Sequence, residues 1–263
     1  MTTRTSLPPP HPALRVSVVV PARDEEVLVD YCLKALAEQD GISPEEYEVL
    51  LILDQCTDAT EDRALEVADE FPELRLRLLD GPGEGSGHAR RVGMETACER
   101  LIGLGRPHGL ISSTDADTIV APDWLVAQLE ATSRGARAIG GRIELANDGS
   151  LPEGVLRWHA ERGRLRHQKL LSDPSHSGKT EHWQFSGASL ALIAAVYREV
   201  GGLEPRTSLE DEHLEQVLRQ QGIPIERLLS VRVTTSTRLS GRAKQGLAHD
   251  LALAFQMQVA SSS

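Results

Sequence analysis

The chain has 263 residues, of which 40% are apolar and 25% are charged, so it has the composition of a globular protein long enough to bury a core. Its formal net charge of −11 argues against nucleic acid as a partner, because phosphate binding needs clustered lysine and arginine. The three cysteines are odd in number and form no C-x-x-C pair, which argues against a disulfide framework or a cysteine zinc site and favours a reducing compartment, the cytoplasm.

A flexible, proline-rich tail is expected at residues 1–14, which contain no apolar segment of the kind found in signal peptides. Strand and helix patterns alternate after it. Residues 16–20 are mostly β-branched and predict a buried strand that stops at Pro21. The same reasoning predicts helices at 24–39, 58–71 and 88–101, and further strands at 47–53, 74–79 and 109–112. Repetition at intervals of ~25–30 residues is typical of right-handed βαβ units.

This alternation predicts an α/β fold with a Rossmann-like, mostly parallel sheet flanked by helices, in a single domain. The second half is less regular, with predicted helices at 122–133, 191–201 and 210–221, a strand at 136–145 and an extended segment at 223–233. Residues 147–178 are rich in charge, histidine, arginine and glycine, without a clear strand.

The C-terminal segment, residues 247–259, is apolar enough to form a helix that packs against the domain or makes a peripheral membrane contact. No apolar run reaches the ~20 residues that a membrane-spanning helix needs, so no transmembrane segment is expected. The oligomeric state is left open.

Polar residues follow the predicted strands at the points where the strands end. They are Pro21, Arg23 and Glu25 after the first strand, Asp54 after the second, and Asp115 and Asp117 after the fourth. Because ligands bind beyond the carboxyl ends of parallel strands, we predict a binding site at this edge.

Asp115 and Asp117 are two residues apart, so in a strand their side chains would point the same way. Two adjacent carboxylates repel each other unless a cation lies between or beside them. A hard divalent cation such as Mg²⁺ or Mn²⁺ fits oxygen ligands of this kind and keeps positions for phosphates and water. The alternative is a solvated turn in which the aspartates cap a helix.

A glycine-rich loop follows the third predicted strand and leads into a helix that carries Arg90 in its first turn. Alternate glycines let backbone amides approach a ligand closely. A cation at a helix N-terminus is unfavourable against the dipole, and a bound phosphate would remove that conflict. The alternative is a mobile loop with solvated arginines. The loop matches neither the dehydrogenase fingerprint nor the P-loop.

Three further features have two interpretations each. Glu210 and Asp211 open a predicted helix, either as an acidic N-terminus or with a general base among them. Trp183 lines an acceptor pocket or belongs to the core. The segment from Arg238 to Arg242 faces a phosphate or forms a solvated turn.

Taken together and in this order, the motifs resemble family 2 glycosyltransferases over residues 16–222. The first strand and its turn resemble the family's P-x-x-N-E-E turn, and Asp115-Ala116-Asp117 resembles its D-x-D. Residues 53–60 resemble D-N-C-T-D-x-T, and Glu210-Asp211-x-x-Leu214 resembles E-D-x-x-L.

The resemblance implies a GT-A fold, a nucleotide-diphosphate sugar donor, and Mg²⁺ or Mn²⁺ as cofactor. It implies that Pro21, Arg23, Glu25 and Asp54 border the nucleoside, that Asp115 holds the ribose, and that Asp117 holds the metal on the diphosphate. Arg90 would stabilise the leaving group. Asp211 would be the base that deprotonates the acceptor hydroxyl, with inversion at the anomeric carbon, and Glu210 and Trp183 would contact substrate. Residues 15–146 would then bind the nucleotide sugar, and residues 147–263 the acceptor.

The chain departs from the family pattern at Asp24, where asparagine is usual, and it lacks the Q-x-x-R-W motif of processive synthases. Transfer of a single sugar is therefore favoured. The alternatives are a retaining glycosyltransferase, a sugar nucleotidyltransferase, against which the glycine-free turn after the first strand argues, and a non-catalytic protein that binds sugar nucleotides. The donor base, the sugar and the acceptor are not indicated.

Overall fold

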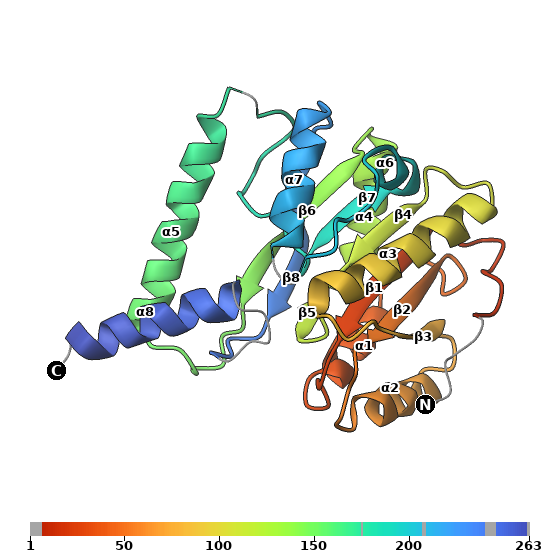
Figure 1. The fold of residues 1–263 in the computed structure, drawn as a ribbon, viewed down its shortest axis with the longest axis horizontal. Coiled ribbons are helices and arrows are strands. Elements are labelled where there is room, and N and C mark those ends of the chain that lie inside the picture. The colour runs from red at the N-terminus through yellow and green to blue at the C-terminus, as the bar shows by residue number, and fades with distance from the viewer. Residues whose placement is uncertain (1–6, 175, 207–208, 240–245, 262–263) are drawn as a thin grey trace.

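The computed structural model describes residues 7–174, 176–206, 209–239 and 246–261, and the strands within them form one eight-stranded sheet (Figure 1). The order across the sheet is β3-β2-β1-β4-β7-β6-β8-β5. The strands are β1 Val16–Ala22, β2 Tyr47–Leu53, β3 Leu76–Asp80, β4 Leu110–Ser113, β5 Thr118–Val120, β6 Ala138–Leu145, β7 Leu190–Ile193 and β8 Ile225–Thr235. The helices are α1 Val29–Ala37, α2 Thr60–Glu70, α3 Ser86–Gly103, α4 Trp124–Ser133, α5 Glu153–Leu171, α6 Ala194–Glu199, α7 Glu210–Gln220 and α8 Leu247–Ser261.

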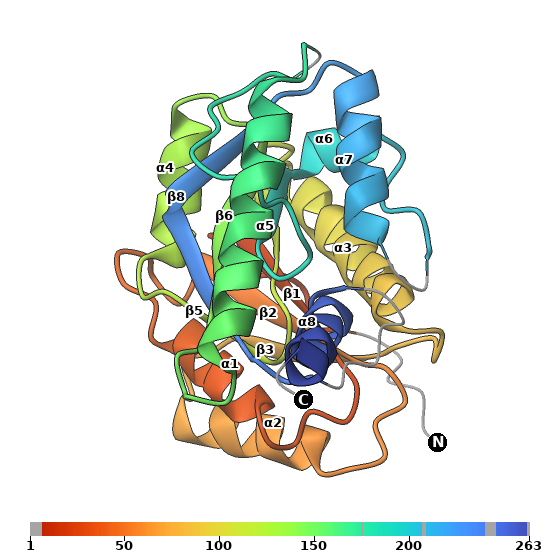
Figure 2. The ribbon, with the colours of Figure 1, turned by 90° about the vertical axis from the view of Figure 1, so that its left-hand side faces the viewer.

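The first half of the sheet is parallel, as the alternating pattern predicts. β1 pairs in parallel with β2 and β4, and β2 pairs in parallel with β3. Every residue of β1 and β2 is buried, which explains their nearly continuous apolar sequences. α3 packs against β1, β2 and β4, and Figure 2 places α3 and α4 on opposite sides of the sheet. The predicted α/β fold is confirmed here, and most predicted boundaries are within a few residues of those observed.

The second half of the sheet is mixed, so the expectation of a mostly parallel sheet holds only for the first. β7 pairs antiparallel with both β4 and β6, while β6 pairs in parallel with β8. β5 pairs antiparallel with β8. Because β7 and β8 come from the second half of the sequence, both halves share one sheet.

Residues 190–193 correct the predicted helix at 191–201. They form the buried strand β7, and the helix that follows, α6, is short. A run of four buried apolar residues fits a strand or a helix, and its place between two strands determined the outcome.

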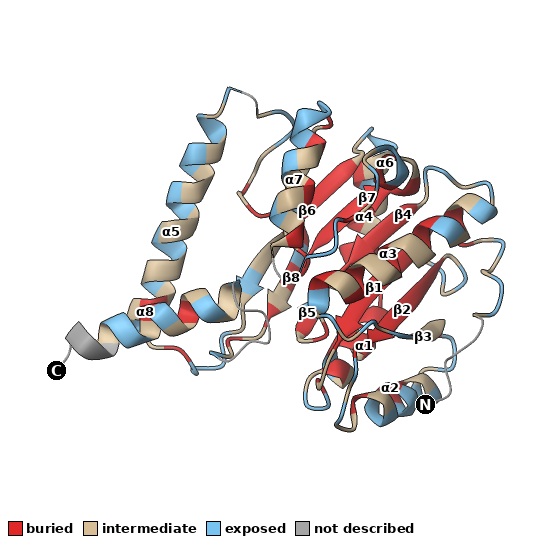
Figure 3. Cartoon of the chain, in the orientation of Figure 1, coloured by how far each residue is buried: buried red, intermediate tan, exposed pale blue. Residues whose placement is uncertain are grey.

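The helix α5 was not predicted, because residues 147–178 showed no pattern that we could interpret. α5 and α8 extend from the body of the domain and pack against each other (Figures 1 and 3). Their shared apolar cluster is small, with four buried residues: Leu151, Val155, Leu251 and Ala254. Val155 is the buried residue of α5 itself. This contact confirms that the C-terminal helix packs within the protein.

The proline-rich tail is attached to the domain over residues 7–14, which corrects the expectation of a flexible tail for that part. Leu14 is fully buried, and the carbonyls of Pro8 and Pro12 accept hydrogen bonds from Arg100 (2.9 Å) and Arg106 (2.7 Å). Proline cannot donate a backbone hydrogen bond, but its carbonyl remains an acceptor, and the two arginines use it. Residues 1–6 lie outside the described part.

Within the described part of the chain, none of the helices combines the length and the apolar character that crossing a membrane requires.

Candidate active site

The turns that follow the parallel strands lie side by side at one edge of the sheet. The Asp54 amide donates to the Ala22 carbonyl (2.8 Å), and the Thr114 amide donates to the Val19 carbonyl (3.1 Å). These bonds continue the ladders beyond the strand ends, so the residues after β1, β2 and β4 are brought together. The structure therefore brings the turns after these strands to one edge of the sheet.

Glu25 and Asp117 share one arginine, although they come from different turns. The Arg238 guanidinium donates to both Glu25 carboxylate oxygens, at 2.8 Å each, and its Nη2 lies 2.9 Å from Asp117 Oδ2. Asp117 also accepts a hydrogen bond from the Ser236 hydroxyl (2.7 Å). The side chains of Glu25 and Asp117 are 8% and 11% exposed, so both carboxylates are nearly buried and the arginine is their shared counter-ion.

Arg90 joins two further carboxylates. Its side chain is 3% exposed, with Nη2 at 2.7 Å from Asp115 Oδ1 and Nε at 3.1 Å from Glu210 Oε1. Its Nη1 donates to the Gly187 carbonyl (3.0 Å) and to the Ser113 hydroxyl. We expected a bound phosphate to balance Arg90 against the helix dipole. Protein carboxylates balance it instead, and this part of the expectation is corrected.

The resulting acidic cluster has an excess of negative charge. Its formal charge is −2, from four carboxylates and two guanidinium groups: Glu25, Asp115, Asp117, Glu210, Arg90 and Arg238. Burial raises the pKa of Asp117, and the like charge of Asp115 raises it further. Burial also raises the pKa of Glu210, against the opposing effect of Arg90. A further cation at this cluster would stabilise the ionised carboxylates.

Asp211 lies beside this cluster at the start of α7. Its Oδ2 accepts a hydrogen bond from the Gly187 amide (3.0 Å), and its Oδ1 accepts one from the Glu212 amide (2.8 Å). Because the Gly187 carbonyl contacts Arg90, the candidate base is linked to the acidic cluster through one residue of backbone. The preceding residue, Leu209, has a φ of 61°, a strained conformation for a branched side chain and one that concentrates at functional sites.

Asp54 has a structural role that we did not predict. Its carboxylate, 2% exposed, accepts hydrogen bonds from the amides of Gly83 (2.6 Å) and Gly85 (3.1 Å). These two amides of the glycine-rich loop therefore face Asp54, whereas we expected them to face a ligand. A Cβ at Gly81 would lie 2.7 Å from Asp54 Oδ1, so the loop needs glycine to approach Asp54 so closely.

The substitution of aspartate for the family's asparagine at position 24 has a conformational explanation. Asp24 has a φ of 50°, in the region that aspartate and asparagine tolerate better than other residues with side chains. Its Oδ1 accepts a hydrogen bond from the Thr57 amide (2.6 Å), a role that either side chain can fill. The departure at position 24 therefore preserves the turn.

The remaining predicted residues are Pro21, Arg23 and Trp183. Pro21 is buried within β1, and Arg23 is 42% exposed with Nη1 at 3.9 Å from Asp54 Oδ2. Trp183 is half-buried, and the Arg166 guanidinium of α5 lies 4.6 Å from its ring centroid. Trp183 therefore belongs to the contact between α5 and the domain, and part of it stays accessible.

His182, next to Trp183, is a buried neutral histidine. Its Nδ1 accepts a hydrogen bond from the Gln184 amide (3.1 Å), and its Nε2 lies 3.3 Å from the Leu228 carbonyl, which fixes one neutral tautomer. Burial lowers the pKa of His182 to about 4. Its role is structural.

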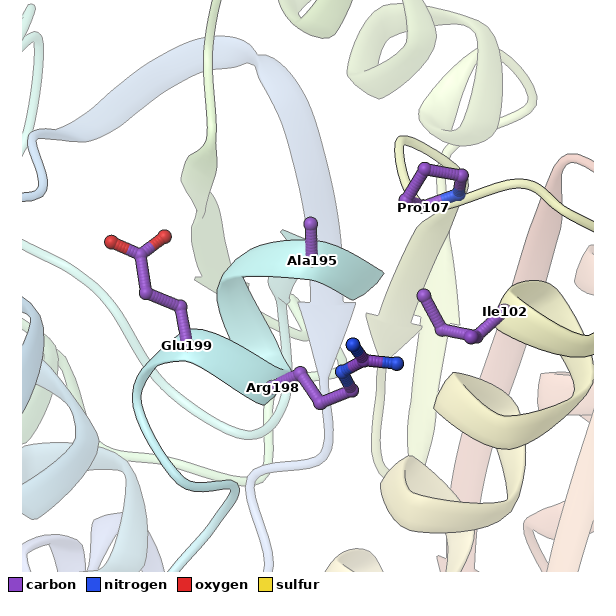
Figure 4. A pocket seen from close by; sticks show the side chains of 5 residues that line it. All are labelled: Ile102, Pro107, Ala195, Arg198 and Glu199. Atoms are coloured by element: carbon purple, nitrogen blue, oxygen red, sulfur yellow. The ribbon is translucent and has the colours of Figure 1, made fainter.

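A cavity of about 370 Å³ lies away from this edge (Figure 4). It is lined by Ile102, Pro107, Ala195, Arg198 and Glu199. Pro107 precedes β4 and Ile102 is near the end of α3, so the cavity lies at the end of β4 opposite to Asp115 and Asp117. We therefore do not assign the chemistry to it.

The sequence model of the glycosyltransferase-like family 2 matches residues 11–248. The chain belongs to this family. It is 22% identical over 212 residues to the probable glycosyltransferase YdaM of Bacillus subtilis (strain 168), an alignment that covers 76% of this chain and 45% of that protein. The chain thus spans about half the length of this curated relative.

Two solved glycosyltransferases have the same fold. The mannosyltransferase PcManGT from Pyrobaculum calidifontis, solved with GDP-Man and Mn²⁺, superposes with a TM-score of 0.63 at 19% identity, over 97% of this chain and 66% of that one. Residues 1–349 of TarS from S. aureus, solved with UDP-GlcNAc, superpose with a TM-score of 0.59 at 16% identity, over 89% of this chain and 62% of that one. These matches confirm the predicted GT-A fold.

Ser236 and Arg238 are the site residues that we did not assign. Arg238 appeared among the candidates as part of a phosphate-facing loop or a solvated turn, and the structure gives it two carboxylate partners instead. Arg242, from the same segment, lies outside the described residues. A short polar segment after the last strand gave no indication of which distant side chains it meets.

Proposed function

We propose that this member of the family is a glycosyltransferase that moves one sugar from a nucleotide-diphosphate sugar to an acceptor hydroxyl, with a divalent cation and with inversion at the anomeric carbon. The observation that carries the proposal is the acidic cluster at the carboxyl ends of β1 and β4, with Asp211 attached to it through Gly187. Family membership and the sugar-nucleotide complexes of PcManGT and TarS support it.

The residues present fit a divalent cation in chemistry, although they supply few ligands. Within the described ranges, no group of three or more histidine, cysteine, aspartate or glutamate side chains is arranged to hold a metal ion. Mg²⁺ is commonly held by one or two carboxylates, with substrate phosphates and water as the other ligands. Asp117 would hold the cation, with Asp115 beside it, and the donor diphosphate would complete the coordination. Such a cation would offset the negative charge that grows on the diphosphate as it leaves.

Asp211 would act as the general base. The two backbone amides that donate to its carboxylate fix the position of that carboxylate. In the proposed reaction the acceptor oxygen forms a bond to the anomeric carbon while the bond to the diphosphate oxygen breaks, and the acceptor proton passes to Asp211. Attack opposite the leaving group inverts the anomeric carbon. The attachment of Asp211 to the cluster argues against a non-catalytic binding protein.

We assign roles to the other predicted residues as well. Pro21, Arg23, Glu25 and Asp54 would border the nucleoside, Asp54 by holding the glycine-rich loop in place. Arg90 would position Asp115 and Glu210, since protein groups already occupy its donors. Trp183 and residues 147–263 would shape the acceptor side, and residues 15–146 the donor side. A cytoplasmic location remains a prediction, supported by three cysteines that are free of disulfides.

The test is a thermal-shift screen of UDP-GlcNAc, GDP-Man and dTDP-glucose, each with and without Mn²⁺. We expect one nucleotide sugar to stabilise the protein only with the metal present, by about 2.7 kcal/mol at one hundred times its Kd. At about 2–4 °C per kcal/mol, this corresponds to a rise in Tm of about 5–11 °C.

Asp117→Ala should abolish the metal-dependent shift, and Asp69→Ala, which removes an exposed carboxylate of α2, should preserve it. A wild-type protein that none of the three donors stabilises would contradict the proposed function.

A further inference from the structure

Arg238 occupies the position where the proposed function needs a cation. It lies three residues after the end of β8, and its partner Glu25 is 213 residues away in the sequence. The guanidinium contacts both Glu25 oxygens and reaches Asp117 Oδ2, so one side chain neutralises two carboxylates from two different turns. A planar fork of donors suits this arrangement.

The contact with Asp117 places a guanidinium on the carboxylate that would hold the metal. Oδ2 accepts from both Ser236 and Arg238, while Oδ1 has only a long contact, 3.4 Å, with the neighbouring Thr118 hydroxyl among the hydrogen bonds described. A divalent cation that approaches Asp117 is therefore repelled by the positive charge of Arg238. The two cations compete for the same carboxylate.

Arg238 and Arg90 differ in their freedom to move. Arg90 is 3% exposed and is held by two carboxylates, a carbonyl and a hydroxyl. Arg238 is 30% exposed, and its described partners are the two carboxylates. Exchange of partners is therefore easier for Arg238, because water can reach its guanidinium during the movement.

We propose that Arg238 is an exchangeable counter-ion: it neutralises Glu25 and Asp117 while no donor is bound, and it releases Asp117 and donates to the donor diphosphate when the nucleotide and a divalent cation bind. The inference rests on the proposed function. Its physical basis is that a guanidinium matches diphosphate oxygens as well as it matches carboxylates. Without a counter-ion, Asp117 would be left almost buried beside the like charge of Asp115.

The test compares three variants for binding of Mn²⁺ alone, measured by the EPR signal of free Mn²⁺. Arg238→Ala should bind Mn²⁺ at least about tenfold more tightly than the wild type, because a competing unit charge is removed. Arg238→Lys retains the charge but cannot contact both carboxylates with a fork, so its affinity should fall between the two. Arg232→Ala is the matched control, since Arg232 is a nearby arginine within β8 that pairs with the half-exposed Asp123, and it should bind Mn²⁺ like the wild type.

The second measurement is binding of the nucleoside diphosphate, UDP or GDP, in saturating Mn²⁺. Arg238→Ala should bind it at least about tenfold more weakly, because a diphosphate contact is lost. The same substitution thus strengthens metal binding and weakens diphosphate binding, a combination that a purely structural role does not produce.

Two outcomes would overturn the exchange: Mn²⁺ affinity of Arg238→Ala no higher than that of Arg232→Ala, or undiminished diphosphate binding. If Arg238→Ala does not fold, Arg238→Lys decides, and wild-type values in both measurements would overturn the exchange. Failure of any nucleotide to bind the wild type would refute the proposed function, whereas Mn²⁺ binding without nucleotide tests the competition separately.

Discussion

Replacing Arg90 with methionine tests whether this arginine holds the acidic cluster together. The substitution keeps most of the side-chain volume and removes the charge from between Asp115 and Glu210. Removing one partner of a buried ion pair costs about 3–5 kcal/mol. Because the Asp115 side chain is 36% exposed and water can replace its contact, we expect the lower part of that range, about 3 kcal/mol, with Glu210 at 7% exposure as the main source.

The assay is urea denaturation of Arg90→Met beside Arg91→Met. Arg91 is the matched control because it is the next residue of α3 and contacts Glu95 at 2.6 Å, with both side chains at least 39% exposed. Surface pairs of this kind contribute about 0–1 kcal/mol. The loss of about 3 kcal/mol expected for Arg90→Met corresponds to a fall in Tm of about 6–12 °C, at about 2–4 °C per kcal/mol.

The loss of stability in Arg90→Met should also depend on pH, and Glu210 determines whether the loss grows or shrinks as the pH falls. Burial raises the pKa of Glu210, and Arg90 opposes that rise, so the variant should have a still higher pKa there. A folded state with a raised carboxyl pKa binds more protons than the unfolded state, and its stability falls as pH rises through the window between the two pKa values. The deficit of Arg90→Met should therefore shrink as pH falls from 8 towards 5. A loss equal to that of Arg91→Met, or a deficit that does not change with pH, would refute this reasoning.

Three further predictions concern other parts of the site and its support. Asp211→Asn should reduce transfer by at least about 100-fold while donor binding in a thermal-shift assay is retained, and wild-type turnover would remove Asp211 from the role of base. Gly178→Ala should destabilise the protein by more than Gly135→Ala in urea denaturation, because both have φ near 100° but a Cβ at Gly178 would lie 2.5 Å from the Ile225 carbonyl oxygen, while at Gly135 it meets open space; equal losses would argue against this close approach of the two backbones. The free energy of unfolding of the wild type should fall by about 3 kcal/mol between pH 6.5 and pH 4 because of His182, since the folded pKa of about 4 lies below the unfolded value. His182→Gln should show a weaker dependence of this free energy on pH, and parallel curves for the two proteins would contradict the prediction.

The parts of the fold that were predicted from sequence are those whose apolar pattern has a single interpretation. β2 is buried on both faces, and its seven residues were predicted with the observed bounds. β7 was taken as the start of a helix, because a four-residue apolar run has no periodicity to distinguish the two. α5 was missed for a different reason: it exposes most of its surface, so its sequence lacks the broad apolar stripe of a helix that lies on a core.

Some features of the candidate site could likewise be predicted from local sequence, and others could not. Asp115, Asp117 and Asp211 could be predicted because each belongs to a local motif. The partners that determine what these residues do could not be predicted, because they come from distant parts of the chain. Arg90 and Glu210 are 120 residues apart, and Asp54 contacts a loop about 30 residues away. Such pairs follow from how the strands are ordered in the sheet, which single-sequence patterns do not reveal.

The distance in sequence between Glu25 and Arg238 has a consequence for biosynthesis. At about 5–20 residues per second, a ribosome needs about 10–40 s to add the 213 residues between them. Throughout that interval the nascent chain carries the acidic turns of its early strands without their arginine. The centre is therefore completed only after β8 has been made and has entered the sheet.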